Sequence, residues 1–340
     1  MIQDALKKVI EGKGLSQDEA KTVMGEIMRG EATPALLAAL LTALRMKGET
    51  ADEIAGFAGE MRAHAVPIRA KKAPVVDTCG TGGDASGSFN VSTVSAFVVA
   101  GAGVTVAKHG NRSVSSSCGS ADVLEACGGK IDLAPPQAEA CLNGVGFAFL
   151  FAPLFHPAMK NVMPVRKELG VRTVFNILGP LTNPAGATAQ VLGVFKPELT
   201  EVMADVLGRL GCERAFVVHG RDGLDEFTIS GPTKVSEWAG GRVKTYEITP
   251  EEIGFSRAPR ESVRGGTAAE NAAILTAILE GREKGPKRDV VLLNAAAALA
   301  AAGKAPSIKE ALPAAQKSID SGAAKSKLEQ FVSFSREVGL

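Results

Sequence analysis

The stretch Val75-Val-Asp-Thr-Cys-Gly80-Thr-Gly-Gly-Asp84 decides how the chain is interpreted. A short apolar run typical of a buried strand leads into a glycine-rich loop, and an apolar helical pattern follows over residues 91–100. In open α/β sheets, ligands bind at such loops, beyond the carboxyl ends of the strands. Glycine lets a phosphate approach the backbone, and the next helix supplies free N–H groups. We predict a phosphate site here; a plain glycine turn followed by a helix cap is the alternative.

Two common nucleotide motifs do not explain this loop. Gly80-x-Gly82-x-x-Ala85 has the spacing of a dinucleotide fingerprint, but that motif needs an acidic residue about 20 positions later to hold the ribose. The chain has no Asp or Glu between Asp84 and Asp122, and it contains no GxxxxGK[ST] string. These absences argue against a nicotinamide dinucleotide site and against a P-loop.

A second polar loop follows the next predicted strand, at residues 104–107. It reads Lys108-His-Gly-Asn-Arg-Ser-Val-Ser-Ser-Ser-Cys-Gly-Ser120 and combines two cations, an imidazole, an amide and five serines. Because both loops leave neighbouring strands in the same direction, we expect them to face one another around an anion. The alternative is a polar surface loop in which Arg112 forms a structural ion pair.

Short apolar runs alternate with helical patterns along the rest of the chain, as in parallel α/β units. Residues 227–248 alternate between apolar and polar, which predicts an antiparallel excursion, and the Ala-rich segment 294–303 predicts a close-packed helix. We expect an α/β fold whose large domain, residues 71–340, has a mainly parallel central sheet flanked by helices. The further predicted strands are at residues 146–151, 191–194, 214–218 and 290–293.

The first 66 residues show helical patterns and no β-rich run. Ser16 followed by Glu19 is a capping-box signature, and Thr33-Pro34 places a good N-cap before a proline at the first helical position. We therefore expect a small all-helical N-terminal domain over residues 1–70.

Composition narrows the range of partners. Lys and Arg number 38 against 37 Asp and Glu, a net charge of +1, and aromatic residues make up 5% of the chain. Neither a basic surface nor stacking platforms for bases are indicated, so no nucleic acid is expected. The longest apolar stretches, near 144–155 and 290–302, are shorter than the roughly 18 residues that a membrane span needs. The five cysteines form no CxxC motif, so we expect free thiols in the cytoplasm.

Two further groups carry charge suited to a small anionic substrate. Asp225-Glu226 follows a glycine turn, and adjacent carboxylates suit Mg²⁺ if a bend brings them to one side. Arg166 has the geometry to clamp a carboxylate, although a surface helix cation is the alternative. No serine or cysteine has an evident base nearby, so no nucleophilic catalysis is indicated.

In combination these motifs resemble the anthranilate phosphoribosyltransferase family of tryptophan biosynthesis, within the nucleoside phosphorylase and phosphoribosyltransferase fold group. The resemblance spans nearly the whole chain, and its small departures (Ala85, Ser88 and Thr267) remove no essential group. The motifs that carry it are Asp77-Thr-Cys-Gly-Thr-Gly-Gly-Asp84, Phe89-Asn-Val-Ser-Thr93, Lys108-His-Gly-Asn-Arg112, His156-Pro-Ala-Met-Lys160, Val174-Phe-Asn-Ile-Leu-Gly-Pro-Leu-Thr-Asn-Pro184, Asp222-Gly-Leu-Asp-Glu226 and Ala269-Glu-Asn-Ala272.

The resemblance implies transfer of the phosphoribosyl group of 5-phosphoribosyl 1-diphosphate to the amine of anthranilate. The products are N-(5-phosphoribosyl)anthranilate and diphosphate, in the second step of tryptophan synthesis from chorismate. It further implies Mg²⁺ as the cofactor, a homodimer, and a helical domain completed by helices from about 156–184. A hinge is expected near residues 67–74 and around that crossing segment, so that two substrates held by two domains can meet.

The resemblance also implies the site residues, none of them catalytic in the sense of forming a covalent intermediate. Mg²⁺ is implied at Ser92, Asp225 and Glu226, and anthranilate at Gly80, Asn111 and Arg166. The donor is implied at Gly80, Gly83, Asp84, Ser88, Asn90, Val91, Ser92, Thr93, Lys108, His109, Gly110, Asn111, Arg112, Ser113, Val114, Ser115, Ser116 and Ser120.

Two other functions compete with this interpretation. A nucleoside phosphorylase of the same fold group would have a nucleobase pocket and no use for an acidic metal pair. A catalytically silent relative that binds nucleic acid would need a basic surface, which a net charge of +1 argues against.

Overall fold

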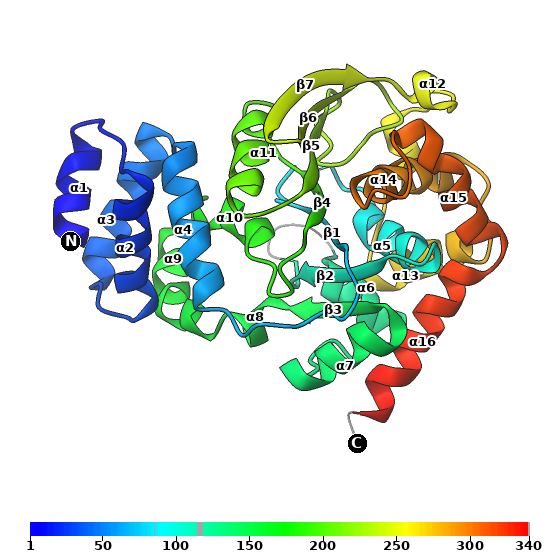
Figure 1. Ribbon diagram of the computed structural model, residues 1–340, viewed down its shortest axis with the longest axis horizontal. Helices are drawn as coiled ribbons and strands as arrows, with labels where there is room; N and C mark the ends of the chain where they lie inside the picture. The colour runs from blue at the N-terminus through cyan, green and yellow to red at the C-terminus, as the bar shows by residue number, and fades with distance from the viewer. Residues whose placement is uncertain (85, 114–117, 339–340) are drawn as a thin grey trace.

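The computed structural model describes residues 1–84, 86–113 and 118–338. Figure 1 shows a bundle of helices at the N-terminal side, on the left, and a larger α/β unit built around one sheet. The predicted fold class, a small helical domain and a large domain with a mostly parallel sheet between helices, is confirmed. No helix among the described residues is long and apolar enough to cross a membrane.

The N-terminal helices begin where their capping residues predict. The Ser16 side chain accepts from the Glu19 N–H while Glu19 accepts from the Ser16 N–H, and Thr33 caps the helix that opens with Pro34. A second capping box, formed by Thr50 and Glu53, begins the last of these helices. The four helices are α1 (Ile2–Ile10), α2 (Gln17–Met28), α3 (Pro34–Lys47) and α4 (Ala51–Ala63).

The sheet has seven strands in the order β3-β2-β1-β4-β5-β6-β7. The first five strands along the chain run parallel, and β6 and β7 add an antiparallel hairpin where alternation predicts one. The strands are β1 (Val75–Gly80), β2 (Thr105–Gly110), β3 (Phe147–Phe151), β4 (Ala189–Gly193), β5 (Arg214–Gly220), β6 (Thr233–Ala239) and β7 (Arg242–Ile248). The chain reaches β2 and β3 on one side of β1 and β4 on the other, so β1 and β4 form a topological switch point.

Helices of the α/β unit lie along the sheet and at its ends (Figure 1). The segment from α8 to η2 crosses from the sheet to the bundle and returns. The helices are α5 (Val91–Gly101), α6 (Ser120–Ala126), α7 (Pro135–Val145), α8 (Ala152–Phe155), α9 (Met163–Leu169), α10 (Phe175–Leu178), α11 (Leu199–Arg209), α12 (Pro250–Ile253), α13 (Ala268–Leu279), α14 (Pro286–Ala301), α15 (Ile308–Asp320) and α16 (Ala323–Glu337), with 3₁₀ helices η1 (Pro157–Asn161), η2 (Gly179–Leu181) and η3 (Arg260–Val263).

The strand predicted at residues 290–293 is wrong, because these residues lie inside α14. Every residue of α14 from Val290 to Ala301 is buried, so the run shows no exposed face that would reveal a helical period. A fully buried helix and a buried parallel strand both appear as continuous apolar runs. The adjoining prediction, a close-packed helix over 294–303, is confirmed as the continuation of the same α14.

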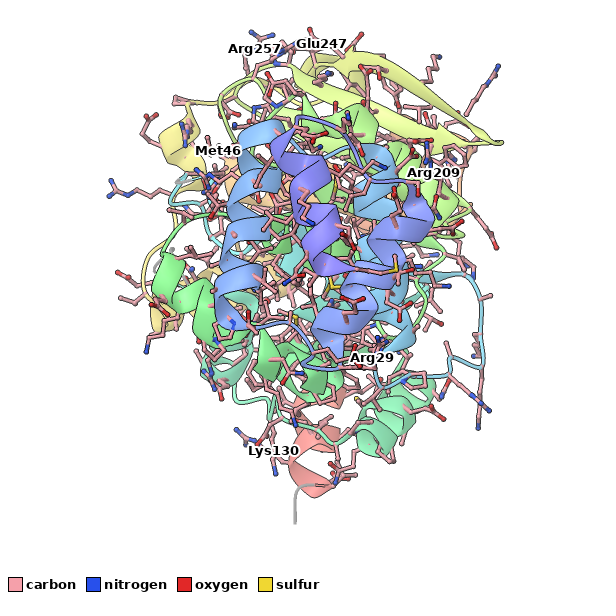
Figure 2. All side chains as sticks on the ribbon, turned by 90° about the vertical axis from the view of Figure 1, so that its left-hand side faces the viewer. Arg29, Met46, Lys130, Arg209, Glu247 and Arg257 are labelled. Atoms are coloured by element: carbon pink, nitrogen blue, oxygen red, sulfur yellow. The ribbon has the colours of Figure 1, made fainter. Side chains whose placement is uncertain are left out.

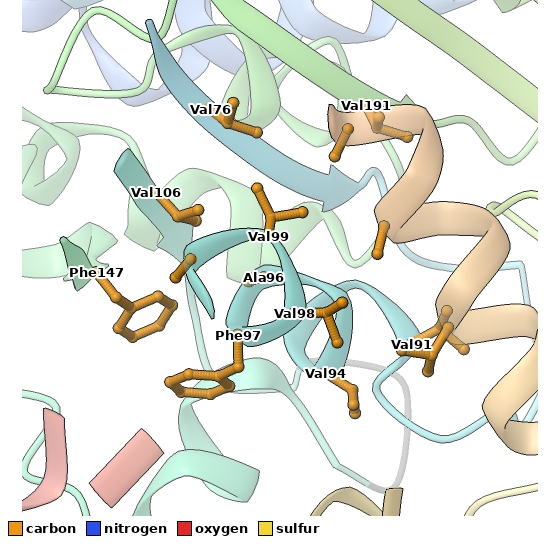
Figure 3. Packing of buried hydrophobic residues seen from close by; sticks show 14 of the residues in the cluster. Val76, Val91, Val94, Ala96, Phe97, Val98, Val99, Val106, Phe147 and Val191 are labelled. Carbon is orange, nitrogen blue, oxygen red and sulfur yellow. The ribbon is translucent and has the colours of Figure 1, made fainter. Parts of the chain in front are cut away.

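Two hydrophobic cores cover the two faces of the sheet. Side chains alternate between faces along a strand, so Val191 faces one core and Leu192 the other. Figure 3 shows the first core, where Phe97 of α5 packs against Phe147 of β3 with ring centroids 4.3 Å apart. The second core is continuous from the helical bundle, through residues of the crossing segment such as Phe175, to β4 and β5. The bundle is therefore packed onto the sheet rather than joined to it by chain alone.

Candidate active site

The glycine loop and the acidic pair meet at the carboxyl ends of β1 and β4. The Gly82 N–H donates to Asp225 Oδ2 at 2.9 Å. A Cβ at Gly80 would overlap the Asp225 carboxylate, and one at Gly193 would overlap the Asp225 backbone, so both positions require glycine. Close approach of the segment that follows β5 thus explains Gly80 of the glycine-rich motif and Gly193 at the end of β4.

A buried lysine and the start of α5 lie beside Glu226. The Ser92 N–H, in the first turn of α5, donates to Glu226 Oε1 at 3.2 Å. Lys108 is 2% exposed, and its ammonium donates to the Thr78 carbonyl at 2.5 Å and to Ser92 Oγ at 3.2 Å. The structure thus joins predicted residues from three separate motifs. Burial lowers the pKa of Lys108, and the neighbouring carboxylates Asp77 and Glu226 oppose that effect.

The acidic pair lies beside Asp84 of the glycine loop. Asp225 and Glu226 lie in the loop between β5 and β6, which satisfies the expected bend, and the Asp225 N–H donates to Asp84 Oδ2 at 3.5 Å. Burial raises the pKa of both Asp225 and Glu226, and repulsion from Asp84 adds to the increase. No group of three His, Cys, Asp or Glu side chains is close enough in the described ranges to form a metal cluster. Adjacent buried carboxylates nevertheless have the donor chemistry that Mg²⁺ requires.

Sequence reasoning missed the role of Asp77, which is fully buried inside β1. Its Oδ2 accepts from Asn183 Nδ2 at 2.8 Å and its Oδ1 from the His109 N–H at 3.4 Å, while the same Asn183 amide donates to the Ala107 carbonyl. Burial raises the pKa of Asp77 to about 6. The carboxylate ties β1, β2 and the crossing segment together directly below the two loops. The signal in the sequence is an acidic residue within an otherwise buried strand.

Two histidines lie together at the crossing segment. The rings of His109 and His156 have centroids 5.0 Å apart, and His109 Nδ1 is 3.2 Å from the Gly179 carbonyl. Burial lowers the pKa of His109 to about 3 and that of His156 to about 4, so both are neutral near pH 7. Neither Nε2 atom has a hydrogen-bond partner within the described part of the chain. Only His109 is predicted from the motifs; His156 is distant in sequence, and its spacing gives no signal.

The second loop is anchored to α6. Arg112 forms a double hydrogen bond to Glu125, at 2.5 and 2.7 Å, and a third bond to Asp122 at 3.1 Å. This is the ion pair considered as an alternative from the sequence, and the contact of Arg112 with a donor stays a prediction. Ser120 Oγ donates to the Asn111 carbonyl at 3.4 Å. The predicted residues Val114, Ser115 and Ser116 lie outside the described residues.

The start of α5 departs from simple capping. Asn90 is the N-cap residue, but its side chain does not cap the helix. The Asn90 side chain donates from Nδ2 to the Cys118 carbonyl at 3.1 Å and accepts at Oδ1 from Asn271 Nδ2 at 3.0 Å. Asn90 therefore connects the second loop to α13. Val91 and Thr93 are fully buried, and their contact with the phosphoribosyl donor stays a prediction. Ser88 forms a backbone bridge with Arg264.

Arg166 lies on α9, in the crossing segment. Its guanidinium stacks over the Phe175 ring, 5.5 Å from the centroid, and burial lowers its pKa. Within the described residues it has no acidic partner, and no hydrogen bond or ion pair connects it to the two loops. An unpaired guanidinium held on an aromatic ring can bind a planar carboxylate.

Comparison with known proteins places this architecture in a class. Residues 72–325 match the glycosyl transferase family a/b domain, and residues 3–65 match the helical bundle domain of the same family. Fold and site together therefore define a two-domain glycosyl transferase.

Whole-chain comparisons identify the family within this class. The anthranilate phosphoribosyltransferase of Moorella thermoacetica is 58% identical over 334 residues, covering 98% of each chain. The crystal structure of the Thermus thermophilus anthranilate phosphoribosyltransferase has a TM-score of 0.93 and 51% identity, covering 98% of this chain and 99% of that one. The Saccharomyces cerevisiae enzyme in complex with PRPP and Mg has a TM-score of 0.90 and 29% identity, covering 99% and 98%. The chain belongs to the anthranilate phosphoribosyltransferase family.

Proposed function

We propose that this chain transfers the phosphoribosyl group of 5-phosphoribosyl 1-diphosphate to the amine of anthranilate, which gives N-(5-phosphoribosyl)anthranilate and diphosphate. The observation that carries the proposal is the junction of Gly82, Ser92, Lys108 and the Asp225-Glu226 pair at the switch point of the sheet. The relatives that bear this activity in their names support the same reaction. In an organism that makes tryptophan from chorismate, this would be the second step.

The donor is proposed to bind between the two loops. Backbone N–H groups of the glycine loop and the first turn of α5 suit phosphate oxygens, and Lys108 adds a buried positive charge. Ser92, Asp225 and Glu226 are proposed to hold Mg²⁺, which when bound would supply positive charge for the departing diphosphate. A yeast relative has been solved with PRPP and Mg.

The acceptor is proposed to lie toward the crossing segment, where Arg166 faces the anthranilate carboxylate and Gly80 and Asn111 complete the pocket. An arylamine is unprotonated near pH 7, so its nitrogen attacks without a strong general base. The neutral state of His109 and His156 avoids placing two further positive charges beside a cation-like ribose. The residues thus orient the amine and stabilise charge, and no covalent enzyme intermediate is required.

The proposal extends to the division into domains, the oligomeric state and the cellular compartment. Residues 1–70 would form the helical domain, completed by helices of the crossing segment, since Asn161 Nδ2 donates to the Met28 carbonyl of α2. A homodimer is proposed through the outer face of the bundle, where Met46 is 83% exposed (Figure 2). The five free thiols suit the reducing cytoplasm.

Two parallel assays test the reaction against phosphorolysis. The protein is incubated either with phosphoribosyl diphosphate, Mg²⁺ and anthranilate, or with a panel of nucleosides and phosphate, and the products are identified by mass spectrometry. We expect phosphoribosylated anthranilate and equimolar diphosphate in the first assay only. Release of a free base in the second assay, with no product in the first, would instead indicate a nucleoside phosphorylase.

A further inference from the structure

We propose that Arg172 is a positioning residue that fixes the peptide between Gly83 and Asp84, and thereby orients the donor loop. The inference rests on the proposed function, because it assigns the loop to the phosphoribosyl donor. Arg172 follows α9 in the crossing segment, and its Nη2 donates to the Gly83 carbonyl in the loop after β1. The two residues are 89 positions apart in sequence.

The guanidinium of Arg172 is itself held in place. It lies over the Phe195 ring, 4.5 Å from the centroid. The Phe195 N–H donates to Thr81 Oγ1 at 3.1 Å, and the Thr81 N–H donates to the Gly193 carbonyl at 2.9 Å. The platform on which Arg172 stacks is therefore fastened to the same loop. Within the described residues Arg172 has no acidic partner, so its side chain is committed to this carbonyl and this ring rather than to an ion pair.

The hydrogen bond from Arg172 sets the orientation of the peptide between Gly83 and Asp84. In a trans peptide, the carbonyl of one residue and the N–H of the next point in opposite directions. With its carbonyl turned to Arg172, the Gly83 peptide presents the Asp84 N–H away from Arg172, while the Gly82 N–H is engaged by Asp225. A loop fixed in this way offers a prearranged N–H to an anion and pays less conformational entropy on binding.

Gly83 has the features that such a contact demands. Its φ of +77° lies in the left-handed region, which favours glycine. A Cβ at this position would also overlap the Arg172 guanidinium. Glycine at position 83 therefore leaves room for the Arg172 side chain and allows the positive φ angle.

The same arginine connects the donor loop to the acceptor side. Arg45 of α3 donates from Nη1 to the Arg172 carbonyl, and Arg166 lies six positions earlier in the crossing segment. A movement of the bundle or of α9 is thus transmitted to the loop through one residue. We expect donor binding, more than acceptor binding, to depend on Arg172.

Calorimetric titration with phosphoribosyl diphosphate and Mg²⁺ tests the assignment. Arg172→Met keeps the length of the side chain and removes its donors, while Arg172→Lys keeps the charge and one donor. Lys167→Met, which removes an exposed cation of α9, is the matched control. We expect Arg172→Met to raise the donor Kd about ten- to a hundredfold, as for loss of a hydrogen bond from a charged group. Arg172→Lys should recover part of this loss, Lys167→Met should bind like wild type, and the KM for anthranilate should change much less.

Hydrogen exchange provides a readout without ligand. The Gly82 and Asp84 amides should exchange faster in Arg172→Met than in wild type, with the amides of α14 unchanged. Wild-type protein that binds donor, together with an Arg172→Met variant of equal Kd and equal loop exchange, would overturn this inference alone. A variant in which donor Kd, anthranilate KM and α14 exchange all change together would also overturn it, as a general structural role. Wild-type protein that binds no donor would overturn the proposed function and this inference with it.

Discussion

Asp225 and Glu226 are adjacent acidic residues, and both are almost fully buried. Each accepts a backbone N–H, from Gly82 and Ser92 respectively, and burial raises the pKa of both carboxyl groups. An opposing cation lowers the free energy of such a pair. We therefore expect the pair to bind a divalent ion.

Changing both acids to amides tests this link. Asp225→Asn with Glu226→Gln should lower kcat at least a hundredfold, because the departing diphosphate loses the ion that neutralises it. The fold should persist, since amides of the same shape replace repelling buried acids. Initial rates at increasing Mg²⁺, with melting temperature as the control for folding, provide the measurement. Near-normal turnover at saturating Mg²⁺ would show that the metal is held elsewhere.

Arg166 gives a second prediction at this scale. Arg166→Ala should raise the KM for anthranilate at least tenfold and leave the KM for the phosphoribosyl donor nearly unchanged, since only the carboxylate loses its charged partner. Lys160→Ala, which removes a nearby cation of the crossing segment, is the control. If the donor KM changes instead, Arg166 belongs to the phosphate side or to the scaffold.

Individual site residues can be predicted from the sequence where a short motif is enough to indicate their chemical role. Lys108 stands out because charge is rare among the glycines and apolar residues around it, and Asp225 and Glu226 stand out as adjacent carboxylates after a glycine turn. Asp77 and Arg172 cannot be predicted in this way, since their partners, Asn183 and Gly83, are about 90 or more positions away along the chain. The pairing of Arg112 with Glu125 also depends on how α6 is placed, which no local pattern specifies.

At the scale of elements, turns and caps were more informative than apolar runs. Capping signatures at Ser16 and Thr33 predicted real helix starts, because side-chain caps act locally. The apolar run at residues 290–293 predicts a strand and lies in a helix, because α14 is buried on all sides and therefore lacks the polar face that would reveal a helical period. The motif at residues 174–184 contains the short helix α10 and the 3₁₀ helix η2, which its sequence does not show.

The start of α4 supports a prediction about stability. Glu53 is fully buried and accepts from the Leu15 N–H at 3.0 Å, the Thr50 N–H at 2.8 Å and Lys47 Nζ at 2.9 Å. Glu53→Ala should lower the free energy of unfolding by about 3 kcal/mol, because it leaves two N–H groups without partners and removes the carboxylate that pairs with the mostly buried Lys47 ammonium.

The equivalent cap residue of α2 is the control. Glu19 has the same capping-box position but its side chain is 38% exposed, so Glu19→Ala should cost about 1 kcal/mol. Urea unfolding of both variants gives the comparison. Equal losses would show that burial of Glu53 contributes nothing beyond the cap.

At the scale of the whole molecule, the bundle and the α/β unit are coupled by more than the linker at residues 67–74. Arg62 of α4 donates to the Leu181 carbonyl at 2.6 Å and to the Leu210 carbonyl at 2.8 Å, and Arg209 of α11 pairs with Asp52. The second hydrophobic core also runs through this junction. Any closure must therefore move the crossing segment together with the bundle.

We expect a donor-bound form that is more closed than the free enzyme, with bending near residues 67–74 and around the 156–184 crossing. Closure would bring the two substrates together and exclude water from a cation-like ribose. Small-angle scattering with and without donor and Mg²⁺ should show a smaller radius of gyration in the complex. An unchanged radius, with unchanged protease sensitivity at both segments, would indicate a rigid, preformed cleft.

Loss of anthranilate fluorescence is the most direct test of the reaction itself. The protein is mixed with anthranilate, phosphoribosyl diphosphate and Mg²⁺, and fluorescence is followed alongside released diphosphate. We predict a loss that requires all three components, stops on chelation of Mg²⁺, and matches diphosphate release one to one. Constant fluorescence in a folded protein that binds the donor, or a loss that proceeds without the donor, would contradict the assignment of this site to phosphoribosyl transfer.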